Sequence, residues 1–178
     1  MPTTVAIPRP GADEHIEYYA RYIAKAPGDD ALAALHLTGE SLLGLMKGVG
    51  ESQALHRYAP GKWSVKEVLN HLTDAERVFA YRALRFARED RTPLPGFDEN
   101  AWAPAARSDR RPLTEIVEEF RAVRAASRAL FGSLDADALG RRGEANQCGI
   151  SVRALAWIIA GHTRHHELVL RERYGLGR

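Results

Sequence analysis

The chain has 178 residues, 45% of them hydrophobic, which is enough to bury the core of one domain over 1–178. Its 25 basic and 23 acidic residues are interleaved, give a formal net charge of +2 and form no basic run, so we expect no nucleic-acid partner. No apolar stretch approaches the ~20 residues that cross a bilayer, the N-terminus does not resemble a secretory signal, and the single cysteine, Cys148, excludes an internal disulfide. We therefore expect a cytoplasmic protein without a membrane partner.

Apolar residues recur with the period of a helix along most of the chain. Residues 1–28 predict an N-terminal extension with a short helix over 14–26, which Pro27 and Gly28 close. Four principal helices are expected over 31–47, 64–87, 113–132 and 151–174. The start of the second is the clearest, because Ser64 and Glu67 have the spacing of a capping box. Four apolar stripes of this length are buried best in an all-α four-helix bundle.

Two segments between these helices lack the helical pattern. Residues 91–112 contain four prolines and Gly96, and predict a long crossover loop between the second and third helices that crosses the bundle end and lines a site. Residues 135–149 predict a turn followed by an irregular or weakly extended segment. Cys148 in this segment is interpreted as a small packed residue, although the nearby helix N-terminus could also stabilise its thiolate.

His162 and His166 lie four residues apart in the middle of the apolar stripe of the last predicted helix. One turn separates them, about 6 Å along the axis, so both imidazoles can reach one ion. A lone histidine on an apolar face is usually a core residue, but two there would bring polar rings into one small volume, and a shared metal removes that cost. Thr163 stands where a zincin motif would have its glutamate, and His165, about 100° from His166, is expected at the surface or behind the ligands. The opposite side is expected to be solvated and carries Arg153, Arg164, Glu167 and Arg171.

His71 lies at the flank of the apolar face of the helix predicted over 64–87 and is the candidate third imidazole. Three neutral histidines from two helices would make an open site for a divalent ion, and such a site suits Zn, Ni or Co. Asp74 follows one turn later and either orients His71 or is solvated. Glu76 falls inside the apolar stripe, where a carboxylate is costly unless paired, so we expect an arginine partner.

Three stretches of the chain resemble the DinB/YfiT-like superfamily. They are YAPGKWSVKEVLNHLTDAERVFAYRALRFARED (58–90), PLPGFDENAW (93–102) and GHTRHHELVL (161–170). The resemblance implies a four-helix bundle with a distinctive crossover topology and a divalent metal ion, usually nickel or zinc. It also implies that one histidine of the second helix and two of the last hold this ion. Carried over, the ligands are His71, His162 and His166, the three residues that the helical spacing also selects.

The resemblance implies several functions. The favoured one is a metal-dependent S-transferase that activates a low-molecular-weight thiol (bacillithiol, mycothiol or glutathione) for attack on an electrophile. Asp98 or Glu99 would position the substrate, and Glu76 is a weaker catalytic candidate. The alternatives are a hydrolase that uses metal-bound hydroxide and a non-enzymatic, stress-associated bundle that binds a metal. An arginine or lysine beside the metal would favour the transferase, because these thiols carry carboxylates.

Relatives with this bundle commonly pair through their helices, so we expect a homodimer. Trp157 and Leu168 project away from the inner stripe of the last helix. We expect them either at a partner surface or beneath the segment 91–112.

Overall fold

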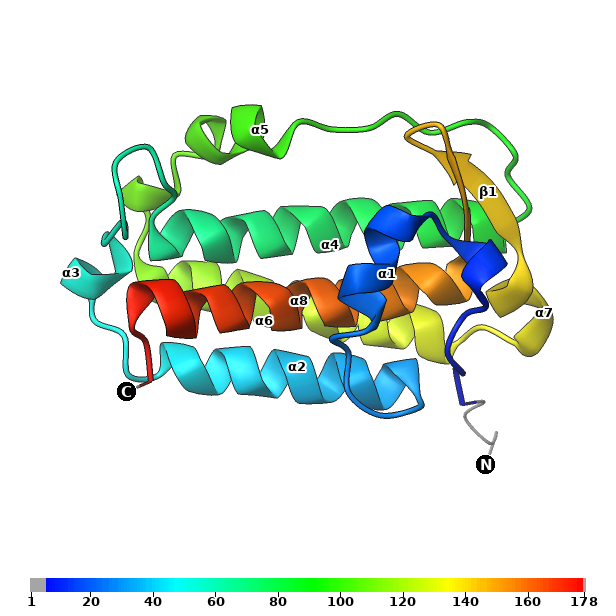
Figure 1. The fold of residues 1–178 in the computed structure, drawn as a ribbon, viewed down its shortest axis with the longest axis horizontal. Coiled ribbons are helices and arrows are strands. Elements are labelled where there is room, and N and C mark those ends of the chain that lie inside the picture. The colour runs from blue at the N-terminus through cyan, green and yellow to red at the C-terminus, as the bar shows by residue number, and fades with distance from the viewer. Residues whose placement is uncertain (1–5, 178) are drawn as a thin grey trace.

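The computed structural model describes residues 6–177 and is a four-helix bundle, as predicted (Figure 1). The bundle helices are α2 (Ala31–Met46), α4 (Val65–Ala87), α6 (Leu113–Gly132) and α8 (Val152–Tyr174). Three of them begin at a capping side chain, because Asp30, Ser64 and Ser151 accept hydrogen bonds from amides of the first turn. Glu67 completes the predicted capping box by accepting from the Ser64 amide. None of the described helices is long and apolar enough to span a membrane.

The bundle helices do not alternate in direction along the chain. In Figure 1, α4 and α6 run one way, and α2 and α8 run the other. The segment 88–112 makes this possible, since it returns along α4. Leu94 pairs with Ala145 near the C-terminal end of α4, and Asp109 accepts a hydrogen bond from the Ser64 hydroxyl at the N-terminal end. The segment therefore follows the length of α4, and the expectation that it crosses the bundle end is wrong.

The connecting segments are more ordered than the sequence suggests. The additional elements are η1 (Ala12–Glu14), α1 (Glu17–Ile23), α3 (Glu51–Ala54), α5 (Glu99–Ala105), η2 (Ser108–Arg110), α7 (Ala136–Gly140), β1 (Arg142–Ala145) and β2 (Cys148–Ser151). The helix expected over 14–26 is thus shorter, and the predicted loop contains α5. The antiparallel strands β1 and β2 pair Arg142 with Ser151. The turn between them has a left-handed φ at both Asn146 and Gln147. An Asn-Gly pair is the usual sequence signal for such a turn, and this chain has Asn-Gln instead, so the hairpin was not predicted.

Trp157 is fully buried beneath the N-terminal extension. Its indole nitrogen donates a hydrogen bond to the Pro8 carbonyl (2.9 Å), and the Arg9 guanidinium lies 4.3 Å from the ring centroid. Trp157 thus lies neither at a partner surface nor beneath the segment 91–112, and both expectations for it are wrong. Leu168 is half-buried. The homodimer stays a prediction that rests on the resemblance, and light scattering at micromolar concentration tests it.

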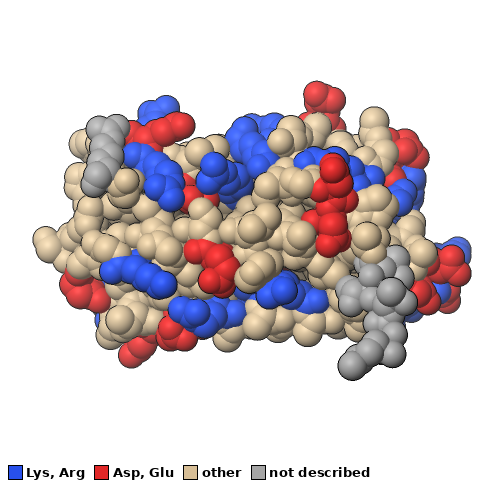
Figure 2. All heavy atoms as spheres, turned by 90° about the horizontal axis from the view of Figure 1, so that it is seen from below, with Lys and Arg blue, Asp and Glu red and all other residues tan. Residues whose placement is uncertain are grey.

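The solvated side expected for α8 is also partly wrong. Glu167 is fully buried and accepts hydrogen bonds from Ser41 (2.7 Å), Arg164 (2.9 Å) and Arg171 (3.0 Å). These arginines lie at the surface and turn inward to neutralise it. On the face seen from the α2 side, acidic and basic residues are interspersed and form no patch of one sign (Figure 2).

The N-terminal helix α1 packs directly on α8, and Gly161 permits this contact. A Cβ atom at Gly161 would lie 1.8 Å from the Tyr22 carbonyl oxygen. The backbone of α1 therefore touches α8 one residue before His162. This close approach determines what lies over the histidines.

Gly161→Ala is expected to destabilise the protein by about 1–3 kcal/mol, because α1 must move to accommodate the methyl group. Gly44→Ala is the matched control: Gly44 lies in α2 with open space around its Cβ position, so the same change should stabilise the helix by about 0.5–1 kcal/mol. Urea denaturation of both variants measures the difference. Equal effects of the two substitutions would contradict the role of Gly161.

Candidate metal centre

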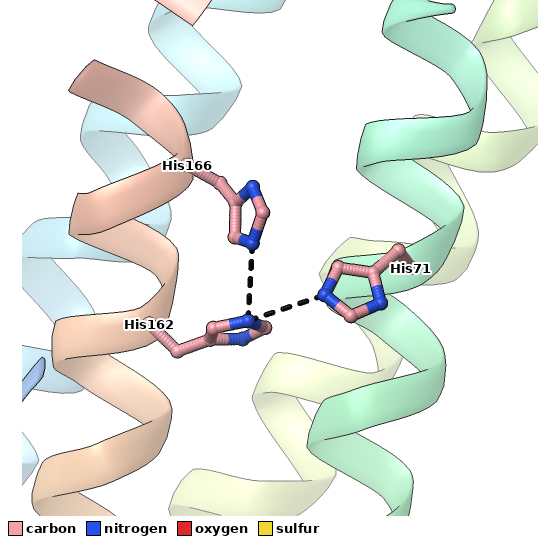
Figure 3. A group of neighbouring side chains, drawn as sticks. All are labelled: His71, His162 and His166. Carbon is pink, nitrogen blue, oxygen red and sulfur yellow. Dashed lines mark hydrogen bonds between the residues drawn. The ribbon is translucent and has the colours of Figure 1, made fainter. Parts of the chain in front are cut away.

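The structure brings His71, His162 and His166 together. His71 comes from α4 and the other two from α8, and their rings point toward one another (Figure 3). The Nε2 atom of His162 lies 3.2 Å from Nε2 of His71 and 3.1 Å from Nε2 of His166. One nitrogen of each ring lies within 4.8 Å of the others. Three potential ligand atoms therefore converge on one small volume.

Hydrogen bonding within the triad does not account for this convergence. The Nε2 atom of a neutral imidazole offers either one N–H or one lone pair, so His162 Nε2 satisfies only one of its two neighbours. A divalent ion would accept a lone pair from all three. Ligands of one tetrahedral ion with bonds of ~2.0–2.1 Å lie about 3.4 Å apart, close to the 3.2 and 3.1 Å that separate His162 Nε2 from the other two rings. The donor set and its geometry thus fit a zinc-sized ion.

Burial keeps the triad in the form that binds metal. Desolvation lowers the pKa of His71 from 6.5 to about 4. Desolvation, and after it the neighbouring imidazoles, hold the pKa values of His162 and His166 well below 6.5. All three rings are therefore neutral at pH 7 with a lone pair available.

The triad opens onto a cavity of about 530 Å³. Its wall is aromatic and comprises Tyr18, Tyr19, Tyr22, Trp63, Phe79 and Phe97. Tyr22 of α1 packs edge-on against His162, with ring centroids 5.3 Å apart, and Trp63 lies 4.9 Å from His71. Sequence reasoning missed this wall, although the tyrosine spacing in EYYARY places Tyr18 and Tyr22 on one side of a helix and could have indicated it.

His165 lines the same cavity but is not part of the converging group. Its ring packs edge-on against Tyr22 (5.4 Å) and His166 (5.0 Å). Its expected role, at the surface or behind the candidate ligands, stays a prediction. Cys148 lies in β2, is half-buried and is not among the cavity-lining residues.

The acidic residues considered for a role at the site differ in where they lie relative to the cavity. Glu99 is half-buried and lines the cavity, whereas Asp98 is exposed and caps α5 by accepting from the amides of Asn100 and Ala101. Asp74 accepts a hydrogen bond from the Asn70 amide (2.7 Å), and none from His71 is found in residues 6–177. The suggestion that Asp74 orients His71 is therefore not supported.

Glu76 lies in the bundle core and has the expected arginine partner. Its carboxylate accepts hydrogen bonds from Nε and Nη2 of Arg124 at 2.9 and 2.8 Å. Arg124 also donates to the Leu35 carbonyl and to the Thr163 hydroxyl, next to His162. This buried network ties together the four bundle helices, including the two that carry the histidines. Glu76 is thus a structural residue outside the cavity.

The lowered pKa values predict how the metal-free protein responds to acid. The unfolded chain takes up protons on these histidines below about pH 6.5, but folded His71 does so only near pH 4. The unfolded state therefore binds more protons in this window, and stability falls as pH drops through it, by about 2–3 kcal/mol for His71 alone. Urea denaturation between pH 7.5 and 4.5 measures this loss. His71→Phe should flatten the profile, and an unchanged profile in this variant would contradict the assignment.

These observations define a class of protein: a helical bundle with three histidines grouped at the floor of an aromatic cavity. Residues 34–170 match the model of the DinB superfamily, and the chain belongs to this superfamily.

Two comparisons with individual proteins agree with this assignment. An 82-residue stretch is 28% identical to a protein of Geobacillus thermodenitrificans (strain NG80-2) described as a "Putative metal-dependent hydrolase". That match covers 46% of each sequence, so the chain spans about half the length of the curated relative it matches. The structure of YfiT from Bacillus subtilis, described as "a probable metal-dependent hydrolase with an unusual four-helix bundle topology", superimposes with a TM-score of 0.69 at 19% identity. It covers 93% of both chains, and at this identity the likeness establishes the fold alone.

Proposed function

We propose that the protein holds a divalent zinc or nickel ion through His71, His162 and His166 and activates a low-molecular-weight thiol for transfer to an electrophile. The observation that carries this proposal is the convergence of three neutral imidazoles at the floor of an open cavity. Neutral ligands leave the charge of the ion uncompensated. Such an ion would supply the positive charge that keeps a thiol, with an ordinary pKa of about 8.5, ionised at neutral pH.

The chain's own residues supply binding and exclusion of water. The aromatic wall covers apolar parts of a ligand and limits solvent access to the triad. The Tyr22 hydroxyl is protonated at neutral pH, as in any ordinary tyrosine, and can donate a hydrogen bond; burial raises its pKa further, to about 12. Glu99 is the one carboxylate among the described residues that line the cavity, and it is suited to position a polar group of the substrate.

A hydrolase is the second candidate, and the descriptions of both relatives favour it. Hydrolysis requires that water lose a proton, and a general base commonly assists. Glu99 is the cavity residue placed to take that role. Glu99→Gln should therefore lower the kcat of hydrolysis strongly. In thiol transfer it should raise the KM and change kcat much less, because a thiol needs no base when the ion lowers its pKa.

The test begins with metal analysis of protein purified without an affinity tag. Conjugation of bacillithiol, mycothiol and glutathione to monochlorobimane is then followed with and without the metal. We expect metal-dependent acceleration with at least one thiol. A fully metal-loaded protein that accelerates none of them would contradict the transferase, and a panel of ester and amide substrates would then test the hydrolase. Inactivity in both assays would favour the non-enzymatic role.

A further inference from the structure

Arg82 of α4 is a buried cation without an acidic partner in the described part of the chain. Its exposed fraction is 3%, equal to that of Lys66 and close to the 4% of Arg124. Lys66 pairs with Glu51 at 2.5 Å and Arg124 with Glu76 at 2.8 Å. Arg82 donates a hydrogen bond from Nη2 to the Pro95 carbonyl, at 2.8 Å, and its second polar neighbour is the neutral hydroxyl of Tyr19. Two of these three buried cations thus have a carboxylate partner, and Arg82 has none.

The surroundings of Arg82 are uncharged. The ring of Phe79 lies 5.8 Å from its guanidinium carbon, and the Tyr19 hydroxyl and the Cys148 thiol are the nearby titratable groups. A guanidinium keeps its charge in proteins, so burial without an anion carries a desolvation cost that these neutral groups offset only in part. An anion beside the guanidinium would offset the rest of this cost.

Arg82 also lines the cavity that holds the triad. Phe79 connects the two, because its ring centroid lies 6.2 Å from that of His162 and 5.8 Å from the Arg82 guanidinium carbon. Arg82 also borders a neighbouring apolar pocket of about 430 Å³ that does not reach the triad. An anion bound to Arg82 from the side of the histidine cavity would belong to a molecule that can also reach the triad. Arg82 is the one arginine or lysine among the described lining residues, which suits a single negative charge better than a phosphate dianion.

We propose that Arg82 anchors one carboxylate of the substrate, and that the part of the substrate next to this carboxylate, its body, is apolar or aromatic. A planar guanidinium matches a carboxylate, and the rings of Tyr19, Phe79 and Phe97 would cover the body. The reaction of the substrate at the triad rests on the proposed function. Binding of the carboxylate by Arg82 does not require the metal.

The test uses metal-free protein, so that no ion competes for the carboxylate. Calorimetric titration compares phenylacetate with phenylacetamide, which differ in charge but hardly in shape. We expect the acid to bind at least tenfold more tightly than the amide, and Arg82→Met to abolish this difference. Arg88→Met, at the exposed end of α4, is the control and should leave the difference unchanged. Equal binding of acid and amide, a preference that survives in Arg82→Met, or tighter Arg82-dependent binding of inorganic phosphate would each overturn the assignment.

The melting temperature of Arg82→Met shows whether Arg82 serves to bind a ligand or to stabilise the fold. Arg82→Met should fold and melt at the same temperature as the parent or higher, because it replaces an unpaired buried charge with an apolar chain of similar length. A marked fall in melting temperature would show that Arg82 holds the fold together, and would overturn its role as an anchor.

A second comparison separates this inference from the proposed function. N-acetylcysteine and its amide have the same thiol and differ in the carboxylate. Metal-dependent conjugation that is equally fast for both would refute the anchor and support the transferase. If none of bacillithiol, mycothiol, glutathione and N-acetylcysteine reacts while the calorimetric preference for phenylacetate holds, the transferase fails and the anchor stands.

Discussion

His162→Ala is expected to weaken metal binding by at least about 100-fold, the largest effect of any single substitution at the site. The Nε2 atom of His162 is the one that lies within 3.2 Å of both other imidazoles, and its removal leaves only the two donors of His71 and His166. Competition with a chromophoric chelator at pH 7.5 measures the affinity. The visible spectrum of the Co²⁺ form reports the change in coordination independently.

The chain provides two matched controls for this experiment. His36→Ala removes an exposed histidine from α2 and should leave the affinity unchanged. His165→Ala removes a cavity residue that lies outside the converging group and should cost far less than His166→Ala. Equal losses for His165→Ala and His166→Ala would show that the wrong member of the adjacent pair has been assigned as a ligand.

Arg124→Met is expected to destabilise the protein by about 3–5 kcal/mol, because it leaves the Glu76 carboxylate buried without its partner. Glu76→Leu should cost a similar amount by stranding the guanidinium. The double variant removes both charges and should be much closer to the parent than the sum of the two losses. Urea denaturation of all four proteins measures this double-mutant cycle.

Strictly additive losses would contradict direct coupling of Glu76 and Arg124.

The same variants test whether the network positions the triad. Arg124 holds the Thr163 hydroxyl at 2.8 Å, so metal affinity should fall in Arg124→Met even where the protein is fully folded. Thr163→Val, which removes that hydroxyl and little else, should show the same direction of change on a smaller scale.

Local signals predicted the bundle helices and the histidine group. Ser64, Glu67 and Ser151 act through bonds within one turn, so the sequence alone identifies the helix starts that they cap. The spacing of His162 and His166 likewise depends on one helix. The pairing of these residues with His71 required the resemblance, because helical periodicity does not show which helices are neighbours.

The features that sequence reasoning missed depend on contacts between distant parts of the chain. Trp157 is covered by Pro8 and Arg9, and no pattern within α8 predicts that cover. Glu167 lies on the side of α8 that the helical wheel assigns to solvent, yet it is buried. Ser41 and two arginines donate hydrogen bonds to its carboxylate and so make this burial possible. Arg82 similarly has the sequence environment of a surface residue, and only the position of Pro95 over α4 shows that it faces a cavity.

The packing of α8 has a consequence for the order in which the protein becomes functional during synthesis. This helix contacts α1, α2 and α4, yet it is translated after all of them. Until it leaves the ribosome, the apolar faces of the earlier helices have no permanent cover, and His71 is the only member of the triad that has been made. The nascent chain therefore cannot complete the triad, and an ion held by all three imidazoles would have to bind after the bundle has closed.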